Sequence, residues 1–226
     1  MGKTYVVSYI VAALCVLNTN AANIIWKIGK ADNSASELAL GPSSYKDFLA
    51  KDFGYEDRYF LIGNSKDDKD FPYVLPGPNN VWGGTWRTSG WRTHSTNILF
   101  GLDRIAEHGE CRLVIDLLDA DPKRSLVKVL VNSVEKKFEI KGKSEKVLDG
   151  VVDEAKEQVL EIPIAASDLK IGGNIVTISV LEGGWIAFDQ VRLEGPHSIK
   201  LKNTHSSMFL RNVSPAKYEI KHGDSM

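Results

Sequence analysis

Short runs of apolar residues, separated by turn-forming residues, dominate the chain beyond residue 23. Most of the runs are rich in Val, Ile and Phe and are bounded by Gly, Pro, Asn, Asp or Ser, which is typical of β-strands. The pattern predicts strands at Ile24–Gly29, Tyr59–Gly63, Asn97–Leu102, Cys111–Leu118, Val127–Asn132, Lys136–Lys141, Val159–Ile162, Asn174–Leu181 and Trp185–Leu193.

Two pairs of neighbouring runs have the spacing of β-hairpins. Asn132-Ser133 divides KVLVNSVEKKFEIKG into two strand-like halves, and Glu182-Gly183-Gly184 divides NIVTISVLEGGWIAFDQVRLEG in the same way. Asn and Gly are the residues that tight turns between antiparallel strands favour. We therefore expect a hairpin at each of these turns.

Helical signal is confined to short segments. Ser44–Gly54 predicts a short helix with Tyr45, Phe48 and Leu49 on one side, and Ser167-Asp168 predicts about one helical turn. Helices do not alternate with strands, so a parallel sheet is disfavoured. The sequence predicts an all-β fold, an antiparallel β-sandwich with one or two short helices, and a polar surface loop over Ser144–Gln158.

The N-terminus has the features of a cleaved secretory signal over residues 1–22. Lys3 precedes the apolar run Tyr5–Leu17, and small residues follow at Ala21-Ala22. The alternative is an uncleaved anchor, for which the run is short. We expect a secreted or periplasmic protein with no membrane span after cleavage.

The sequence predicts one β-sandwich domain over residues 23–197, followed by a tail at 198–226. Strand-like pieces at Ile199–Lys202 and Met208–Val213 make this tail resemble the start of a further β-domain that has been truncated. After signal cleavage Cys111 would be the sole cysteine, so an internal disulfide is excluded. Its apolar surroundings predict a small core residue.

The charge balance and the missing motifs exclude several classes of function. The chain has 28 basic and 29 acidic residues and a net charge of -1, which argues against nucleic acid as a partner. It contains no G-x-S-x-G elbow, no P-loop, no H-E-x-x-H and no dinucleotide fingerprint. Common hydrolases and nucleotide-binding enzymes are thus disfavoured.

The segment VWGGTWRTSGWRTHS (Val81–Ser95) contains Trp82, Trp86 and Trp91. Its glycines disfavour a helix and place the rings on a loop or a strand edge. Exposed aromatic rings on a β-sandwich can stack on the apolar face of a sugar while polar neighbours bond its hydroxyls. The alternative is that these tryptophans fill the core.

Polar partners for a sugar surround the three rings. The guanidinium forks of Arg87 and Arg92 match a uronate carboxylate, and His94 adds a further polar group. Tyr73 is an additional ring in DDKDFPYVLPG. We therefore expect a polysaccharide, with uronate-containing chains as a favoured class, to bind at these residues.

No cofactor is expected from the sequence, although the acids in DDKD suggest a structural calcium ion. Asp67, Asp68 and Asp70 offer oxygen ligands but lack the glycine and closing glutamate of an EF-hand loop. A solvated acidic turn is the alternative, so the metal question stays open. Asp189 interrupts an apolar strand, where an acid is expected to be paired, metal-bound or at an edge.

Several of these motifs together resemble a known family. Trp26-Lys27-Ile28-Gly29 with Ala31-Asp32 and Glu37-Leu38, followed by YFLIGNSKDDKDFPYVLPG, is similar to the C-terminal carbohydrate-binding-like domain of family 4 polysaccharide lyases, the rhamnogalacturonan lyases. The final strands look like the closing hairpin of a galactose-binding-like jelly roll. The resemblance covers about Asn23–Pro196.

The resemblance implies a non-catalytic polysaccharide-binding module, ancillary to the breakdown of pectin or rhamnogalacturonan. In those lyases the catalytic residues belong to a separate N-terminal β-domain. One alternative is a polysaccharide lyase in which His94 or Tyr73 acts as base and Arg87 binds the uronate carboxylate. Another is a structural module that packs against a larger carbohydrate-active enzyme.

Overall fold

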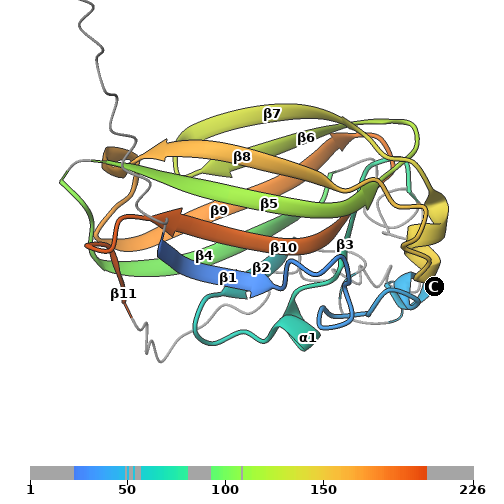
Figure 1. Ribbon diagram of the computed structural model, residues 1–226, viewed down its shortest axis with the longest axis horizontal. Coiled ribbons are helices and arrows are strands. Elements are labelled where there is room, and N and C mark those ends of the chain that lie inside the picture. Colours follow the sequence, from blue (N-terminus) through green and yellow to red (C-terminus); the bar gives the residue numbers. More distant parts are fainter. Residues whose placement is uncertain are drawn as a thin grey trace, which may run out of the picture.

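Two stacked β-sheets form the body of the molecule (Figure 1). The computed structural model describes residues 23–48, 50, 53, 57–80, 93–107 and 109–202. The sheet in front in Figure 1, the front sheet, contains β1 (Asn23–Gly29), β3 (Val74–Pro76), β5 (Glu110–Ala120), β8 (Gln158–Ala165) and β10 (Trp185–Gly195). The back sheet contains β2 (Arg58–Leu61), β4 (Ser95–Arg104), β6 (Arg124–Val131), β7 (Val134–Lys141), β9 (Gly172–Glu182) and β11 (Lys200–Lys202).

The sheet order confirms the predicted antiparallel sandwich. The front sheet runs β1-β10-β5-β8, with β3 also paired to β10. The back sheet runs β11-β4-β9-β6-β7, with β2 beside β4 in the one parallel pairing among the described strands. All nine predicted strands are present within a few residues of their expected bounds, the strand-like piece predicted at Ile199–Lys202 is β11, and β3 is additional. The predicted piece Met208–Val213 lies outside the described residues, as does the signal segment 1–22.

The helices are as short as expected. They are the 3₁₀ turns η1 (Tyr45–Asp47), η3 (Glu145–Asp149) and η4 (Ala166–Asp168), together with the α-helical turn α1 (Asp67–Asp70). The turn at η4 confirms the prediction at Ser167-Asp168. Of the helix expected over Ser44–Gly54, the described residues show η1, and Leu49 lies outside the described residues.

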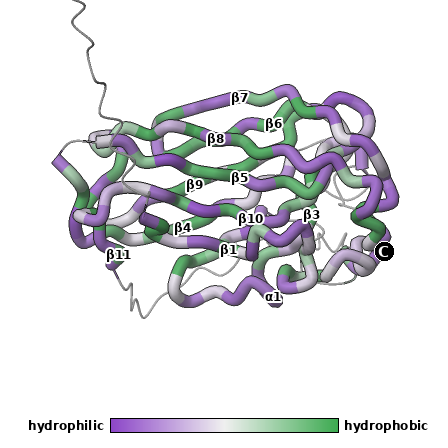
Figure 2. Tube along the Cα trace, viewed as in Figure 1, coloured by the Kyte–Doolittle hydropathy of each residue, from purple (hydrophilic) through white to green (hydrophobic). Residues whose placement is uncertain are grey.

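The predicted polar loop Ser144–Gln158 needs a correction. It contains η3, in which Val147 and Leu148 are buried in the core. The surrounding charged residues concealed this two-residue apolar contact from the sequence pattern. Elsewhere the hydrophobic residues follow the strands, whereas α1 is hydrophilic (Figure 2).

The core lies between the two sheets and has an aromatic centre. Phe71, after α1, contacts Phe60 of β2 and Phe188 of β10 at ring-centroid distances of 5.7 and 5.2 Å. Side chains of β9 alternate between buried and half-buried from Asn174 to Ile178, as one inward face requires. Cys111 is completely buried, as predicted, and burial raises the pKa of its thiol to about 11.

The closing segment is not the expected hairpin. β9 pairs with β4 and β6 in the back sheet, whereas β10 pairs with β1, β3 and β5 in the front sheet. The turn at Gly183-Gly184 therefore carries the chain from one sheet to the other. Gly183 has a φ of 98°, and a Cβ there would lie 2.3 Å from the Ser125 hydroxyl. The hairpin expected at Asn132-Ser133 is confirmed by the β6–β7 pairing.

A buried carboxylate and a glycine fasten the connection after β7. Asp119 is completely buried, and its carboxylate accepts hydrogen bonds from the backbone N–H groups of Lys143 (2.9 Å) and Ser144 (3.1 Å). The chain approaches β5 so closely at Gly142 that a Cβ would lie 1.6 Å from the carbonyl oxygen of Ala120. Only glycine fits there without moving backbone.

We expect Gly142→Ala to lower the free energy of unfolding by about 2–4 kcal/mol, because the added methyl group displaces one of two packed backbone segments. Gly173→Ala in β9 is the matched control, since no atom lies within 4 Å of a Cβ at that position. Urea unfolding followed by tryptophan fluorescence measures both values. Equal stability of the two variants would contradict the close approach at Gly142.

Candidate functional site

The tryptophan-rich segment is attached at one end of the sandwich, between β3 and β4. Trp82, Trp86, Trp91, Arg87 and Arg92 belong to residues 81–92, which lie outside the described residues. The structure does describe both attachment points, Asn80 on the outgoing side and Thr93 on the returning side. For this part of the predicted site, the structure therefore shows how the two ends of the segment are held.

The outgoing end is fixed to the turn between β9 and β10. The N–H of Gly77 donates to the carbonyl oxygen of Gly184 at 2.5 Å, and the N–H of Asn79 donates to that of Gly183 at 3.2 Å. The side-chain amide of Asn80 also donates to the Gly184 carbonyl. A Cβ at Gly184 would clash with the carboxylate of Asp121. The glycine pair thus lets three strand connections meet at this end.

The returning end is fixed to β2 and β9. The N–H of Ser95 donates to the carboxylate of Asp57 at 2.9 Å, and the Ser95 hydroxyl lies 2.6 Å from that of Ser179. His94 precedes this contact and is 2% exposed. The structure therefore places the imidazole of His94 below the surface, so it offers little area to a ligand.

Tyr73 is part of the core. Its side chain has no exposed surface, and its hydroxyl donates to the carbonyl oxygen of Leu148 at 2.8 Å. Burial, helped by the charge of Asp149, raises the pKa of Tyr73 well above its ordinary value. A fully buried ring cannot stack on a sugar, and a phenol whose pKa is raised stays protonated at neutral pH, so it offers no phenolate to act as a base. The buried position of Tyr73 therefore does not support the ligand-binding role predicted for it.

Two of the tryptophans serve the core. Trp26 of β1 and Trp185 of β10 are 4% and 2% exposed. The ring of Trp26 packs against Phe100 with centroids 5.4 Å apart. Trp26 and Trp185 therefore fill the core from regular strands. The core-filling alternative that the sequence left open for Trp82, Trp86 and Trp91 falls outside the described residues.

The family model described as "CBM-like: Polysaccharide lyase family 4, domain III" matches residues 24–193. The chain belongs to this family. The match confirms the resemblance seen at Trp26–Gly29, and it makes this protein a domain III homologue that is related to carbohydrate-binding modules.

Several solved structures are similar to this domain III homologue, and all of them are distant. The "CBM35 from Cellvibrio japonicus Abf62" is 11% identical, with a TM-score of 0.38 over 79% of this chain and 98% of that chain. A family 35 carbohydrate-binding module from an environmental isolate is 15% identical, with a TM-score of 0.32 over 49% and 69%. The GH115 glucuronidase BtGH115A is 19% identical, with a TM-score of 0.31 over 44% of this chain and 13% of that chain. No curated protein matches the chain significantly.

The structure explains the glycine that ends Trp26-Lys27-Ile28-Gly29 in this chain. Gly29 has a φ of +75°, and a Cβ there would lie 2.3 Å from the carbonyl oxygen of Asp189. The N–H of Gly29 donates to the carboxylate of Asp67 in α1 at 2.9 Å. The motif therefore joins β1, β10 and the acidic turn at one point.

Asp189 holds the loop that follows this glycine. Its carboxylate is 1% exposed and accepts hydrogen bonds from the N–H groups of Asn33 (3.2 Å) and Ser34 (3.1 Å). Burial raises the pKa of Asp189 to about 6. The two hydrogen bonds lower this pKa, whereas the negative charges of Asp116 and Asp32 raise it further. Of the three outcomes expected for this acid, the structure shows the paired one.

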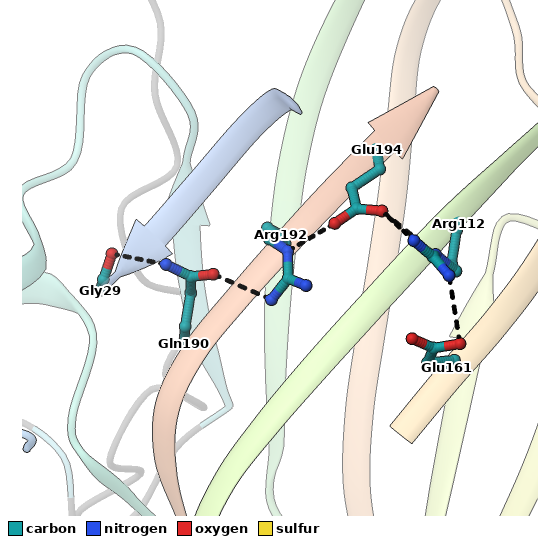
Figure 3. Close-up of polar contacts among 6 residues, drawn as sticks. All are labelled: Gly29, Arg112, Glu161, Gln190, Arg192 and Glu194. Atoms are coloured by element: carbon teal, nitrogen blue, oxygen red, sulfur yellow. Dashed lines mark hydrogen bonds and ion pairs between the residues drawn. The ribbon is translucent and has the colours of Figure 1, made fainter. Parts of the chain in front are cut away.

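The outer face of the front sheet carries a continuous polar network (Figure 3). The Arg192 guanidinium donates to Gln190 at 3.0 Å and to Glu194 at 2.7 Å. Arg112 donates to the other oxygen of Glu194 at 2.6 Å. Burial opposes ionisation of Glu194, but these two arginines hold its pKa below the ordinary value. The residues in the network are Gly29, Gln190, Arg192, Glu194, Arg112 and Glu161.

The acids of DDKD contribute to the fold through backbone contacts. Asp67 accepts the Gly29 N–H, and Asp70 accepts the N–H of Lys66 at 2.8 Å. Within the described ranges, no group of three or more His, Cys, Asp or Glu side chains could hold a metal ion. None of the helices in this part of the chain has the length and apolar character needed to cross a membrane.

Replacing Tyr73 with Phe tests the core position of this ring. We expect the loss of about 1–2 kcal/mol of stability, because the buried carbonyl of Leu148 loses its donor. Glycan binding should not change. A Tyr73→Phe protein with native stability and weakened glycan binding would instead place the hydroxyl at a ligand.

Asp189→Asn tests the buried acid through the pH dependence of stability. Because the folded-state pKa is raised from 3.8 to about 6, the wild-type protein should lose about 3 kcal/mol relative to the variant as the pH rises from 4 to 7. Below pH 4 this contribution is fully present, and above pH 6 it is gone. Urea unfolding of both proteins at several pH values measures it, and a pH-independent difference would refute the raised pKa.

Proposed function

We propose that this protein is a secreted, non-catalytic module that binds a uronate-containing polysaccharide. The observation that carries the proposal is its membership of a family of carbohydrate-binding-module-like domains that belong to polysaccharide lyases. Secretion is supported by the signal-like sequence of residues 1–22. The glycan would come from pectin or rhamnogalacturonan, and the module would assist a larger enzyme that cleaves it.

The binding platform is formed by Trp82, Trp86 and Trp91, with Arg87 and Arg92 as the partners of a carboxylate. The different positions of the five tryptophans in the chain support this assignment. Trp26 and Trp185 lie in strands and fill the core, whereas the other three lie together between Asn80 and Thr93. The attachment of that segment to two strand connections provides a rigid base, which lowers the entropic cost of binding.

Alanine substitution of two rings tests this platform. Trp86→Ala combined with Trp91→Ala should weaken binding to rhamnogalacturonan at least about tenfold, since each stacked ring contributes roughly 1 kcal/mol. Isothermal titration on the chain from Asn23 onward measures the affinity. Lys123→Ala, in the exposed turn between β5 and β6, is the control at the same end of the sandwich.

The outcomes separate binding from the other functions. Unchanged affinity in the folded double variant would remove these tryptophans from the site. Release of unsaturated uronate from pectin, detected by ultraviolet absorbance, would show lyase activity and contradict a non-catalytic module. A folded wild-type protein that binds no glycan but associates with a larger carbohydrate-active enzyme would instead indicate a structural module.

A further inference from the structure

The outer face of the back sheet carries a row of aliphatic side chains. In β4, Ile98 and Phe100 point into the core, so Leu99 between them points outward. In β9, Val176 and Ile178 point inward, so Ile175 points outward as well. The outer face of an antiparallel sheet in a sandwich is ordinarily polar, and outward aliphatic side chains there indicate a surface that takes a partner.

We name this surface the β4–β9 face. Its aliphatic row crosses three strands, because Leu61 of β2 pairs with Leu99 and Leu99 pairs with Ile175. All three side chains are half-buried. The outward residues used below are Tyr59, Leu99, Ile175, Thr177, Leu130 and Lys128.

A row of hydroxyl and amide groups runs beside the aliphatic row. Tyr59 pairs with Asn97, and Asn97 pairs with Thr177, which pairs with Leu130. The Thr177 hydroxyl donates to the side-chain oxygen of Asn97 at 2.7 Å, and the Asn97 amide donates to the Arg58 carbonyl at 3.2 Å. These contacts fix the orientation of the groups and leave the Thr177 oxygen able to accept a further hydrogen bond.

A second hydroxyl pair lies one step nearer to the tryptophan-rich segment. The hydroxyls of Ser95 and Ser179 are 2.6 Å apart, so one donates to the other and one O–H remains available. Ser95 lies two residues beyond Thr93, where the segment 81–92 returns. The β4–β9 face therefore begins two residues from the point where that segment rejoins the described part of the chain. Two polar rows beside one aliphatic row match the amphipathic surface of a glycan chain.

The positive charge of the lysines on the β4–β9 face favours an anionic glycan. Lys128 of β6 points outward between Ser179 of β9 and Lys137 of β7. Lys137 is paired with Glu135 at 3.2 Å, whereas Lys128 makes no ion pair with another described residue. Two lysines directly opposite each other repel, and a bound carboxylate would relieve that repulsion.

The outer face of the front sheet differs from the β4–β9 face, because its arginines are bonded to a neighbouring carboxylate. Arg192 and Arg112 are both bonded to Glu194 there, so the charges of that network satisfy one another (Figure 3). Lys128, which faces Lys137, and the aliphatic row of Leu61, Leu99 and Ile175 belong to the back sheet, whereas the front sheet has Lys27 and Val159 at exposed positions. The two faces therefore provide matched positions for control substitutions.

We propose that the β4–β9 face is a second contact surface for the same glycan, with a uronate carboxylate at Lys128. This inference rests on the proposed function and adds a glycan-contact surface formed by β2, β4, β9 and β6. Leu99 and Ile175 cover the apolar face of the sugar, and Thr177 and Ser95 bond its hydroxyls.

Two pairs of variants test the surface in the chain from Asn23 onward. Lys128→Met should weaken binding to de-esterified homogalacturonan about fivefold at low salt and leave binding to neutral galactan unchanged. Lys27→Met, on the exposed outer face of the front sheet, is its control. Ile175→Arg should weaken binding about tenfold by blocking the aliphatic row, and Val159→Arg, at a front-sheet position that is 47% exposed, is its control.

The results distinguish failure of this proposal from failure of the proposed function. A wild-type protein that binds none of the glycans overturns both. If Lys128→Met and Ile175→Arg have native melting temperatures and bind homogalacturonan with the affinity of the wild-type protein, only the proposal for the β4–β9 face is overturned. Sedimentation that shows a wild-type dimer and a monomeric Ile175→Arg variant would assign the face to contact between copies of the chain and would also overturn the proposal.

Discussion

The buried carboxylate of Asp189 is the constraint around which the described structure is arranged. It lies in β10, whose two edges are occupied by β1 and β3 on one side and β5 on the other. Through two backbone N–H groups it holds the loop that leaves β1, and Gly29 lets the two chains approach closely enough for this contact. The first and last long strands of the domain are thereby fixed to each other.

This constraint accounts in physical terms for the positions of Trp26, Gly29 and Asp67 in this chain. Trp26 anchors β1 in the core, and Gly29 adopts a left-handed conformation against the backbone of β10. Asp67 then captures the N–H of that glycine. Asp67, one of the acids from which the sequence suggested a metal ion, thus accepts a hydrogen bond from a backbone N–H group. Such a bond satisfies a carboxylate as a metal ion would.

Local patterns predicted the strands well, because each strand shows its own alternation or apolar run. They did not predict which strands pair. The turn at Gly183-Gly184 has hairpin composition but changes sheets, since β10 is already paired along both edges. For Tyr73 the sequence showed a ring beside an exposed-looking acidic turn, and nothing local indicated that its hydroxyl would reach Leu148, 75 residues away. The Asp119 contact was missed for the same reason, although a second acid in the apolar run CRLVIDLLDA is a usable signal for a buried, backbone-bound carboxylate.

The sandwich is stabilised by buried polar and aromatic side chains, namely Asp119, Asp189, Trp26, Trp185 and Tyr73. The glycan contacts that we propose are the segment between Asn80 and Thr93 and the outward side of β4 and β9. Affinity electrophoresis of the chain from Asn23 onward, against rhamnogalacturonan, homogalacturonan and neutral glycans, tests this account most directly. The account predicts retardation by a uronate-containing glycan with a parallel change in tryptophan fluorescence. A well-folded protein that migrates unchanged through every glycan would contradict it.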